Sequence, residues 1–191
     1  MGLVDTLKRE FDLTIEWLGF EIHPETPPEG MPLVKMFPRA DVDGMTRRLN
    51  SMGAPYGLSF QKIVNISNSR LSLEAGEFAK EQGRFDEFHH AVFEAYFAQC
   101  RDIGNTEVLA QIGQGSGLDP AALKRALETG TYRKQLNEIK EAAAGLNVTA
   151  APTFIINNAD RIVGAQPIEV FRERLRALWP SSHSVSPHSS P

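Results

Sequence analysis

The cysteine count sets the first limit on the chemistry of this chain. Cys100 is the single cysteine among 191 residues, so neither a disulfide within the chain nor a Cys-x-x-Cys motif can form. Cys100 itself is a candidate nucleophile, because a neighbouring cation such as Arg101 lowers the pKa of a thiol. It follows Tyr96 and Phe97 at the end of an amphipathic segment. That setting favours the simpler role of a small, partly buried apolar residue.

Two adjacent histidines and two loops offer candidate sites for a metal ion or a phosphate group. His89 and His90 lie on a predicted helix, where neighbouring side chains point roughly 100° apart and cannot both face one ion. The segment Asp41-Val-Asp43-Gly44 lacks the spacing and the distal Glu of a calcium loop. The glycines at 113, 115 and 117 follow a helix rather than a strand and have no Lys-Ser/Thr after them. We therefore predict no metal site and no phosphate loop.

The strongest local signal lies just before a predicted apolar strand, in residues 148–157. Pro152 directly precedes this strand, so the Ala151–Pro152 peptide bond is a candidate for the cis form. In the cis form, the backbone groups of the residue before the proline can hydrogen-bond an extended peptide as an added strand. The alternative is a turn that only orients the strand. Asn68, just before Ser69, suits a helix cap.

The composition restricts the class of partner. Lys+Arg number 20 and Asp+Glu 24, which gives a formal net charge of −4 and a pI of about 5.8. A protein that neutralises many phosphates normally carries a basic surplus, so nucleic acid is excluded as the main partner. Strictly apolar runs are short, such as 154–156, so we predict no membrane span. With no signal peptide recognised and one cysteine, we predict a cytoplasmic protein.

The spacing of apolar residues predicts an α/β core interrupted by helices. Residues 1–11 have the four-residue apolar steps of an amphipathic helix, and residues 13–18 have the alternation of a strand. Residues 41–146 are almost wholly helical in periodicity. A β-hairpin then follows at 153–165, and a helix at 167–178.

One helix within this block is marked at both ends. Asp119 predicts its N-cap, Pro120 its first turn and Gly130 its end.

Several segments, in order along about residues 2–179, resemble one protein family. They are Ile15-Glu-Trp-Leu-Gly-Phe-Glu-Ile-His-Pro-Glu25 with Pro28-Glu-Gly30, Asn68-Ser-Arg70, Gly83-Arg-Phe-Asp-Glu-Phe-His-His90, Ala95-Tyr-Phe97, Arg101-Asp-Ile-Gly104, Thr149-Ala-Ala-Pro-Thr-Phe154 and Gly164-Ala-Gln-Pro167. The family that they resemble is the FrnE-like branch of the DsbA oxidoreductases. The related hydroxychromene-carboxylate isomerases, which depend on glutathione, share this architecture and have an Asn in the position of Asn68.

The resemblance implies a thioredoxin-like α/β fold with a helical insertion. The thioredoxin-like core is expected at residues 1–40 plus 147–179, and the helical insertion at 41–146. Residues 180–191 are Ser, His and Pro with one Val, and we predict a disordered tail there.

The resemblance also implies that one strand and both catalytic cysteines are missing. In the family, a strand followed by Cys-x-x-Cys precedes the first helix, whereas here Met1 falls inside that helix. The missing strand is then the first central one, between 13–18 and 153–157, and the family dithiol lies upstream of Met1. Three explanations follow: a start assigned too late, a strand donated by another chain, or a redox-inactive relative with a repacked sheet. We favour the first.

By resemblance, the leading function is thiol–disulfide oxidoreductase, inactive as the chain stands because no catalytic residue of the dithiol is present. The substrate-binding residues implied are Ala151, Pro152, Thr153 and Asn68. The implied partner is a disulfide-containing protein or a small thiol, with no cofactor, and a homodimer stays open. Two alternatives are a glutathione-dependent isomerase-like enzyme, with glutathione as its cofactor, and a non-catalytic peptide-binding module.

Overall fold

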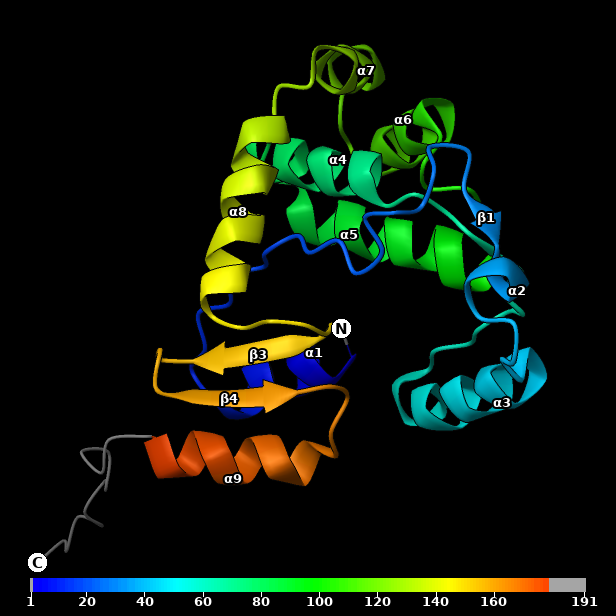
Figure 1. Cartoon of the computed structure of the whole chain (residues 1–191). Helices are drawn as coiled ribbons and strands as arrows, with labels where there is room; N and C mark the ends of the chain where they lie inside the picture. Colours follow the sequence, from blue (N-terminus) through cyan, green and yellow to red (C-terminus); the bar gives the residue numbers. More distant parts are fainter. Residues whose placement is uncertain (1, 179–191) are drawn as a thin grey trace, which may run out of the picture. The chain divides into compact units, whose positions relative to one another are not determined.

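Figure 1 shows the computed structural model, which describes residues 2–178. The predicted tail at 180–191 lies outside the described residues. The elements follow in the order α1 (Gly2–Glu10), β1 (Met31–Pro32), α2 (Leu33–Met36), α3 (Val42–Gly53), η1 (Ala54–Tyr56), β2 (Asn65–Ile66), α4 (Arg70–Glu81), α5 (Phe85–Phe93), η2 (Glu94–Ala98), α6 (Thr106–Gly115), α7 (Pro120–Thr129), α8 (Arg133–Gly145), β3 (Thr153–Ile156), β4 (Asp160–Val163) and α9 (Ile168–Leu178).

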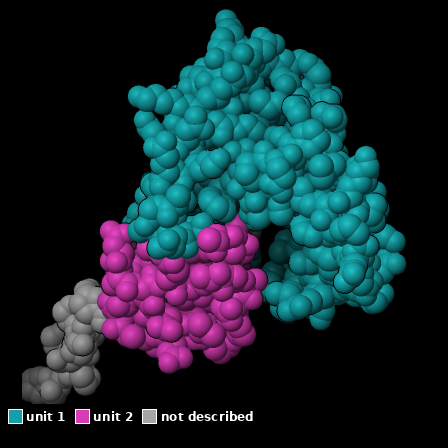
Figure 2. Space-filling model, viewed as in Figure 1, with its two compact units in different colours: residues 1–2, 14–148 teal, residues 3–13, 149–191 magenta. Residues whose placement is uncertain are grey.

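The chain forms two compact units, which Figure 2 colours separately. The first unit comprises residues 1–2 and 14–148, and the second comprises residues 3–13 and 149–191. Each unit is described by itself. The predicted division into a core at 1–40 plus 147–179 and an insertion at 41–146 stays a prediction.

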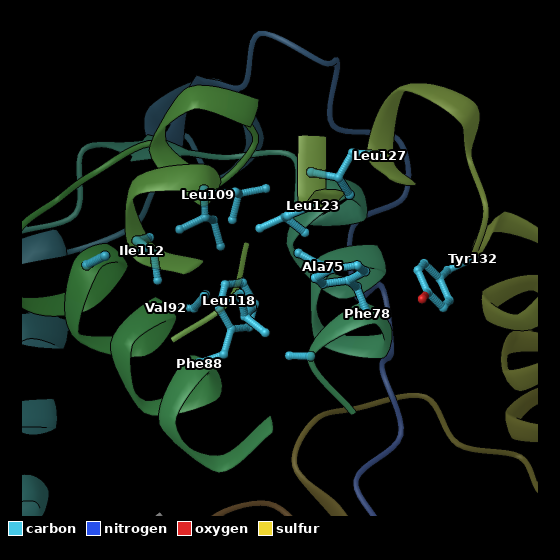
Figure 3. Packing of buried hydrophobic residues seen from close by; sticks show 13 residues of the cluster. Ala75, Phe78, Phe88, Val92, Leu109, Ile112, Leu118, Leu123, Leu127 and Tyr132 are labelled. Carbon is cyan, nitrogen blue, oxygen red and sulfur yellow. The ribbon is translucent and has the colours of Figure 1, made fainter. Parts of the chain in front are cut away.

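Helix α4 is the centre of the first unit. It contacts α5, α6, α7 and α8, and its Ala75 and Ala79 have no solvent exposure. Small side chains at these positions let the neighbouring helices approach closely. Figure 3 shows the apolar side chains that fill the space around α4. The buried cluster consists of Ala75, Phe78, Ala79, Phe88, Val92, Ala95, Ile103, Leu109, Ile112, Leu118, Leu123, Leu127 and Tyr132.

Helix α7 begins and ends where its sequence predicts. The Asp119 carboxylate accepts hydrogen bonds from the backbone N–H groups of Ala121 (2.8 Å) and Ala122 (3.1 Å). Pro120 occupies the first turn, and Gly130 ends the helix with φ +65°. The cap and the left-handed glycine are local signals, and the predicted helix is confirmed.

The second unit packs α1 and α9 against a β-hairpin. Strand β3 pairs with β4 in an antiparallel register that places Phe154 opposite Ile162, which confirms the predicted hairpin. Asn157 and Asn158 make the turn with φ of +50° and +54°, a region that asparagine tolerates. The buried residues of this unit are Leu7, Ile162, Phe171 and Leu175, with Leu3, Phe11, Leu13, Phe154, Ile156, Ile168 and Val170 packed against them.

The strand predicted at residues 13–18 is absent, which corrects that expectation. Residues 12–20 have no helical or strand assignment, and Ile15 and Leu18 are exposed. An extended segment becomes a strand only when a neighbour pairs with its backbone, and the described residues supply no such ladder here. Trp17 instead contacts the His89 ring, with centroids 4.8 Å apart.

The described residues contain two small sheets, of which the β3–β4 hairpin is one. The other pairs β1 with β2 through Met31↔Ile66 and Pro32↔Asn65, and the sequence analysis did not predict it. Across residues 2–178, no helix combines the length and apolar character that crossing a membrane requires.

Candidate functional site

The loop before β3 is exposed and held at several points. Ala151 and Pro152 are exposed, and the peptide bond between them is cis. The Thr153 hydroxyl donates to the Ala150 carbonyl at 2.7 Å. The Gly164 N–H donates to the Pro152 carbonyl at 2.8 Å. The loop therefore presents Ala151 and Pro152 to solvent while its two sides are fixed.

Gly164 reaches the loop because of its backbone conformation. Its φ is +79°, a value that residues with a Cβ rarely adopt. The Gln166 side chain donates to the Val163 carbonyl at 3.0 Å and fixes the same turn. Two segments of the sequence resemblance, 149–154 and 164–167, thus meet in space within the second unit.

Strand β3 has an open edge beside this loop. Within the described chain its one strand neighbour is β4. Thr153 and Ile155 lie opposite Val163 and Arg161. The Gly164–Pro152 bond shows that residue 152 faces β4, so by alternation the N–H and C=O groups of Thr153 and Ile155 point to the opposite edge. This is the edge beside which the sequence resemblance predicts a missing strand.

Asn68 lies in the first unit and links a loop to the start of α4. Its side-chain amide donates to the Thr26 carbonyl at 2.5 Å, and its side-chain oxygen accepts from the Arg70 N–H at 2.9 Å. This geometry fits the helix-capping role that the sequence offered. The glutathione-site role expected from the isomerases stays a prediction.

Arg70 follows Asn68 and joins several parts of the first unit. Its guanidinium donates to Glu21 at 3.0 Å and contacts Glu74 at 3.4 Å. The same group donates to the Arg133 carbonyl at 3.1 Å and to the Asn137 side chain at 2.9 Å. Glu74 is 1% exposed, so this cation neutralises a carboxylate that water barely reaches. The sequence analysis did not predict the network, because apart from the neighbouring pair Arg70 and Glu74 its members are far apart along the chain.

His89 is enclosed by aromatic rings rather than by metal ligands. Its ring stacks on Phe85 with centroids 5.0 Å apart, and its centroid lies 4.7 Å from that of Phe93. Burial in this setting lowers the pKa of His89 to about 4, so the ring is neutral at pH 7. The His90 ring bonds instead to the Asp86 carbonyl at 2.7 Å. Within residues 2–178, no group of three or more His, Cys, Asp or Glu side chains is arranged to hold a metal ion.

Cys100 is exposed, which corrects the partly buried position predicted for it. The helical segment η2 ends at Ala98, and the chain turns at Cys100 with φ +53°. The turn takes the side chain away from the buried cluster, and its Sγ lies 3.8 Å from the Lys62 carbonyl. Arg101 donates to the Gln111 side chain at 2.6 Å.

Comparison with known proteins gives one consistent result. Residues 3–176 match the model of the DSBA-like thioredoxin domain. The uncharacterized protein YwbO of Bacillus subtilis is 30% identical over 169 residues, which cover 86% of this chain and 82% of the relative.

Two solved structures share the fold. A probable DsbA oxidoreductase of Streptomyces coelicolor has a TM-score of 0.76 at 24% identity, over 90% of this chain and 76% of that one. A protein of Nitrosomonas europaea, described provisionally as a protein disulfide isomerase, has a TM-score of 0.64 at 14% identity, over 92% and 87%. At these identities, the two structures establish the fold alone.

Proposed function

This chain belongs to the DSBA-like thioredoxin domain family, and from that membership we propose that it is the substrate-holding part of a thiol–disulfide oxidoreductase. The observation that carries the proposal is the loop at Ala151 and Pro152. Both residues are exposed, while the Gly164 N–H fixes the Pro152 carbonyl at 2.8 Å. A rigid, exposed backbone is suited to hold an extended chain. We assign Ala151, Pro152 and Thr153 to this role, with Asn68 as a further candidate.

The chemistry of this class needs two thiols. A thiolate attacks one sulfur of the substrate disulfide, the S–S bond breaks, and the departing thiolate takes up a proton. A second thiol then attacks the mixed disulfide, so the substrate is reduced and the dithiol is oxidised. The 191 residues contain a single cysteine, so we propose that the dithiol comes from residues outside them.

A second candidate function is favoured by the same cysteine count. A non-catalytic module would use the loop to bind extended peptides and would need no thiol. Its binding would therefore persist when Cys100 is replaced by Ser.

The finer assignments are part of the proposal. We place the chain in the FrnE-like branch on the segments quoted above, and we propose a disulfide-containing protein or a small thiol as its substrate. A cytoplasmic location is supported by the low cysteine content. Self-association as a homodimer is a further proposal, to be measured in solution.

The deciding experiment is an insulin-reduction assay with two forms of the protein. We expect the 191-residue chain to show no turnover above the background given by dithiothreitol. An N-terminal extension that adds a strand and Cys-x-x-Cys before Gly2 is expected to confer turnover, and the same extension with Ser-x-x-Ser is the control. Turnover by the unextended chain would contradict the role given to the absent dithiol. An inactive but folded extended form would leave the binding module as the better description.

A further inference from the structure

The exposed apolar side chains of this protein are concentrated around helix α3. Half of the large apolar side chains that are exposed in the described part of the chain lie within residues 34–64. In α3, Met45, Leu49 and Met52 recur at helical spacing and are 49%, 38% and 43% exposed (Figure 1). An amphipathic helix normally packs its apolar side on the rest of the protein. Helix α3 leaves that side in solvent.

The helix is attached to the fold through a different side. The Asn50 side chain donates to the Phe60 carbonyl at 2.8 Å and accepts from the Phe60 N–H at 2.9 Å. At 100° per residue, Asn50 lies roughly opposite the two methionines. The same loop brings Leu58, which is 42% exposed, against the end of α3 at Gly53. We call Met45, Leu49, Met52 and Leu58 together the α3 face. The attachment of α3 does not depend on this face being covered.

Positive charge surrounds the α3 face. Residues 31–66 contain five Lys and Arg against two Asp, in a chain whose formal net charge is −4. Asp43 is already paired with Lys62 at 2.8 Å. Arg48 is exposed, lies one helical turn from each methionine of the face, and forms no ion pair within residues 2–178. A partner that covers the face therefore matches it best with apolar side chains and a nearby carboxylate.

The helical segment after α3 contacts the beginning of the described chain. A Cβ at Gly2 would lie 2.6 Å from the Cβ of Tyr56 in η1, and both residues belong to the first unit. In the function proposed above, the dithiol precedes Gly2. The segment that carries it then enters beside η1, which directly follows α3. A polypeptide held on the α3 face is accordingly close to the place where the thiols act.

We propose that the α3 face binds apolar segments of unfolded protein substrates, and that Arg48 favours segments containing Asp or Glu. Folded proteins bury most of their large apolar side chains, so an exposed apolar segment distinguishes an unfolded chain. Methionine is unbranched and flexible, which lets one surface adapt to many sequences. The proposal rests on the function proposed above and deepens it, because it selects a polypeptide over a small thiol as the substrate.

Three other occupants fit this face less well. A second copy joined by a two-fold axis would bring the same positive segment close to itself, and like charges oppose that contact. Membrane binding scales with buried apolar area, and four side chains supply little of it. The strand that the resemblance implies before Gly2 is expected beside residues 13–18 and 153–157, not beside α3.

The first test changes the apolar side chains. The probe is a fluorescein-labelled peptide of Leu, Val and Ser that contains Glu and no cysteine, and anisotropy measures its binding to the 191-residue chain. We expect Leu49→Ser to raise the Kd about fivefold or more. Leu146→Ser is the matched control, because Leu146 is 47% exposed in the same unit but outside the α3 face, and it is expected to change the Kd less than about twofold. Equal effects would overturn the proposal. Circular dichroism checks that both variants are folded.

The second test changes the charge and needs no substitution in the apolar face. A peptide with Gln in place of Glu is expected to bind the wild type about threefold more weakly at low salt. This difference is expected to disappear in Arg48→Gln and to persist in Arg125→Gln, since Arg125 is exposed on α7. Equal binding of the two peptides to the wild type would overturn the role of Arg48. If Leu49→Ser fails to fold, Met45→Gln replaces it in the first test.

Three measurements test the other occupants, and each positive result would overturn the proposal. A dimer in sedimentation that Leu49→Ser converts to a monomer would assign the face to a second copy. Binding to vesicles of phosphatidylcholine and phosphatidylglycerol that depends on Leu49, without peptide binding, would assign it to a membrane. Loss of peptide binding in the Ser-x-x-Ser extended form would show that the added segment covers the face.

The insulin assay separates this proposal from the function on which it rests. Turnover by the Cys-x-x-Cys extended form without peptide binding removes the assignment of the α3 face alone. Peptide binding that depends on Leu49, without turnover, removes the oxidoreductase proposal alone.

Discussion

Arg172 donates two hydrogen bonds to the Glu10 carboxylate, from Nη2 to Oε1 at 2.6 Å and from Nε to Oε2 at 2.8 Å. The pair joins α9 to α1, whose residues are far apart along the chain but belong to one compact unit. A two-point contact between a guanidinium and a carboxylate fixes orientation as well as distance. This polar contact therefore fixes α1 and α9 relative to each other, beside the apolar cluster that they share.

This pair predicts an acid-sensitive contribution to stability. The hydrogen bond from Arg172 holds the pKa of Glu10 below its usual range. A lowered carboxylate pKa stabilises the folded state above the unfolded pKa of about 4.3, and this stability is lost as the pH falls through the folded pKa. We expect Glu10→Gln to lower the melting temperature at pH 7 more than at pH 3. An equal change at both pH values would show that the charge of Glu10 contributes nothing.

We expect removal of the Arg70 side chain to lower the stability of the first unit strongly. Arg70→Ala leaves the buried Glu74 carboxylate without its nearest cation, 3.4 Å away, while Arg133 stays at 3.8 Å. Removing one member of a buried ion pair costs about 3–5 kcal/mol. Urea unfolding followed by circular dichroism measures this. Arg47→Ala is the control, since Arg47 is largely exposed and its pairing with Asp41 is long, at 4.0 Å. We expect it to cost less than about 1 kcal/mol. Similar losses in the two variants would refute the network.

Buried His89 makes the stability of the folded state depend on pH in a second range, above the one set by Glu10. Its pKa is lowered by burial to about 4, whereas an unfolded histidine titrates near 6.5. The stability from neutral His89 is therefore complete above about pH 6.5 and declines as the pH falls toward 4. We expect the wild type to lose roughly 1–2 kcal/mol more than His89→Phe between pH 7 and 4.5. Water reaches part of the ring, so this is less than the full shift implies.

The control for this experiment is the adjacent histidine. His90 is exposed, and His90→Gln is expected to keep the wild-type pH dependence. Parallel pH profiles for wild type and His89→Phe would contradict the assignment to His89.

We expect the conformation of the loop before β3 to require a residue with positive φ at position 164. Its φ is +79°, so Gly164→Ala introduces backbone strain although the nearest atom to the new Cβ is 3.9 Å away. We expect a loss of about 1–2 kcal/mol in stability and a weaker hold on Pro152. Gly145→Ala is the matched control, because its Cβ meets nothing within 4 Å and its φ is ordinary. That change is expected to be neutral or stabilising by up to about 1 kcal/mol. Equal effects of the two substitutions on thermal unfolding would exclude the role of backbone conformation.

The predictions from sequence succeeded where the signal is local. The helix from Pro120 is fixed by the Asp119 cap and by Gly130, all within one short segment. The predicted β-hairpin is equally local, and its turn lies at Asn157 and Asn158. The thioredoxin-like α/β fold with helical insertion is confirmed by the match over residues 3–176. That prediction needed several motifs in order, because periodicity alone gives the elements and not their arrangement.

The predictions failed where a residue's state depends on a distant partner. Residues 13–18 have the pattern of a strand, but alternation does not supply the neighbour that a strand requires. Cys100 ends an amphipathic segment, yet the turn after Ala98 leaves its side chain in solvent. The open edge of β3 was predicted by the family resemblance, which implies a missing strand beside residues 153–157, and not by the periodicity of the sequence.

The second unit is built from two segments that are far apart along the chain, and this affects the order in which its parts can fold during synthesis. Its first helix, α1 (Gly2–Glu10), leaves the ribosome long before the hairpin and α9, against which it packs. The intervening residues 14–148 form a unit of their own and can fold while the nascent chain lengthens. The apolar face of α1 therefore stays exposed until translation has reached residues 153–178, against which it packs.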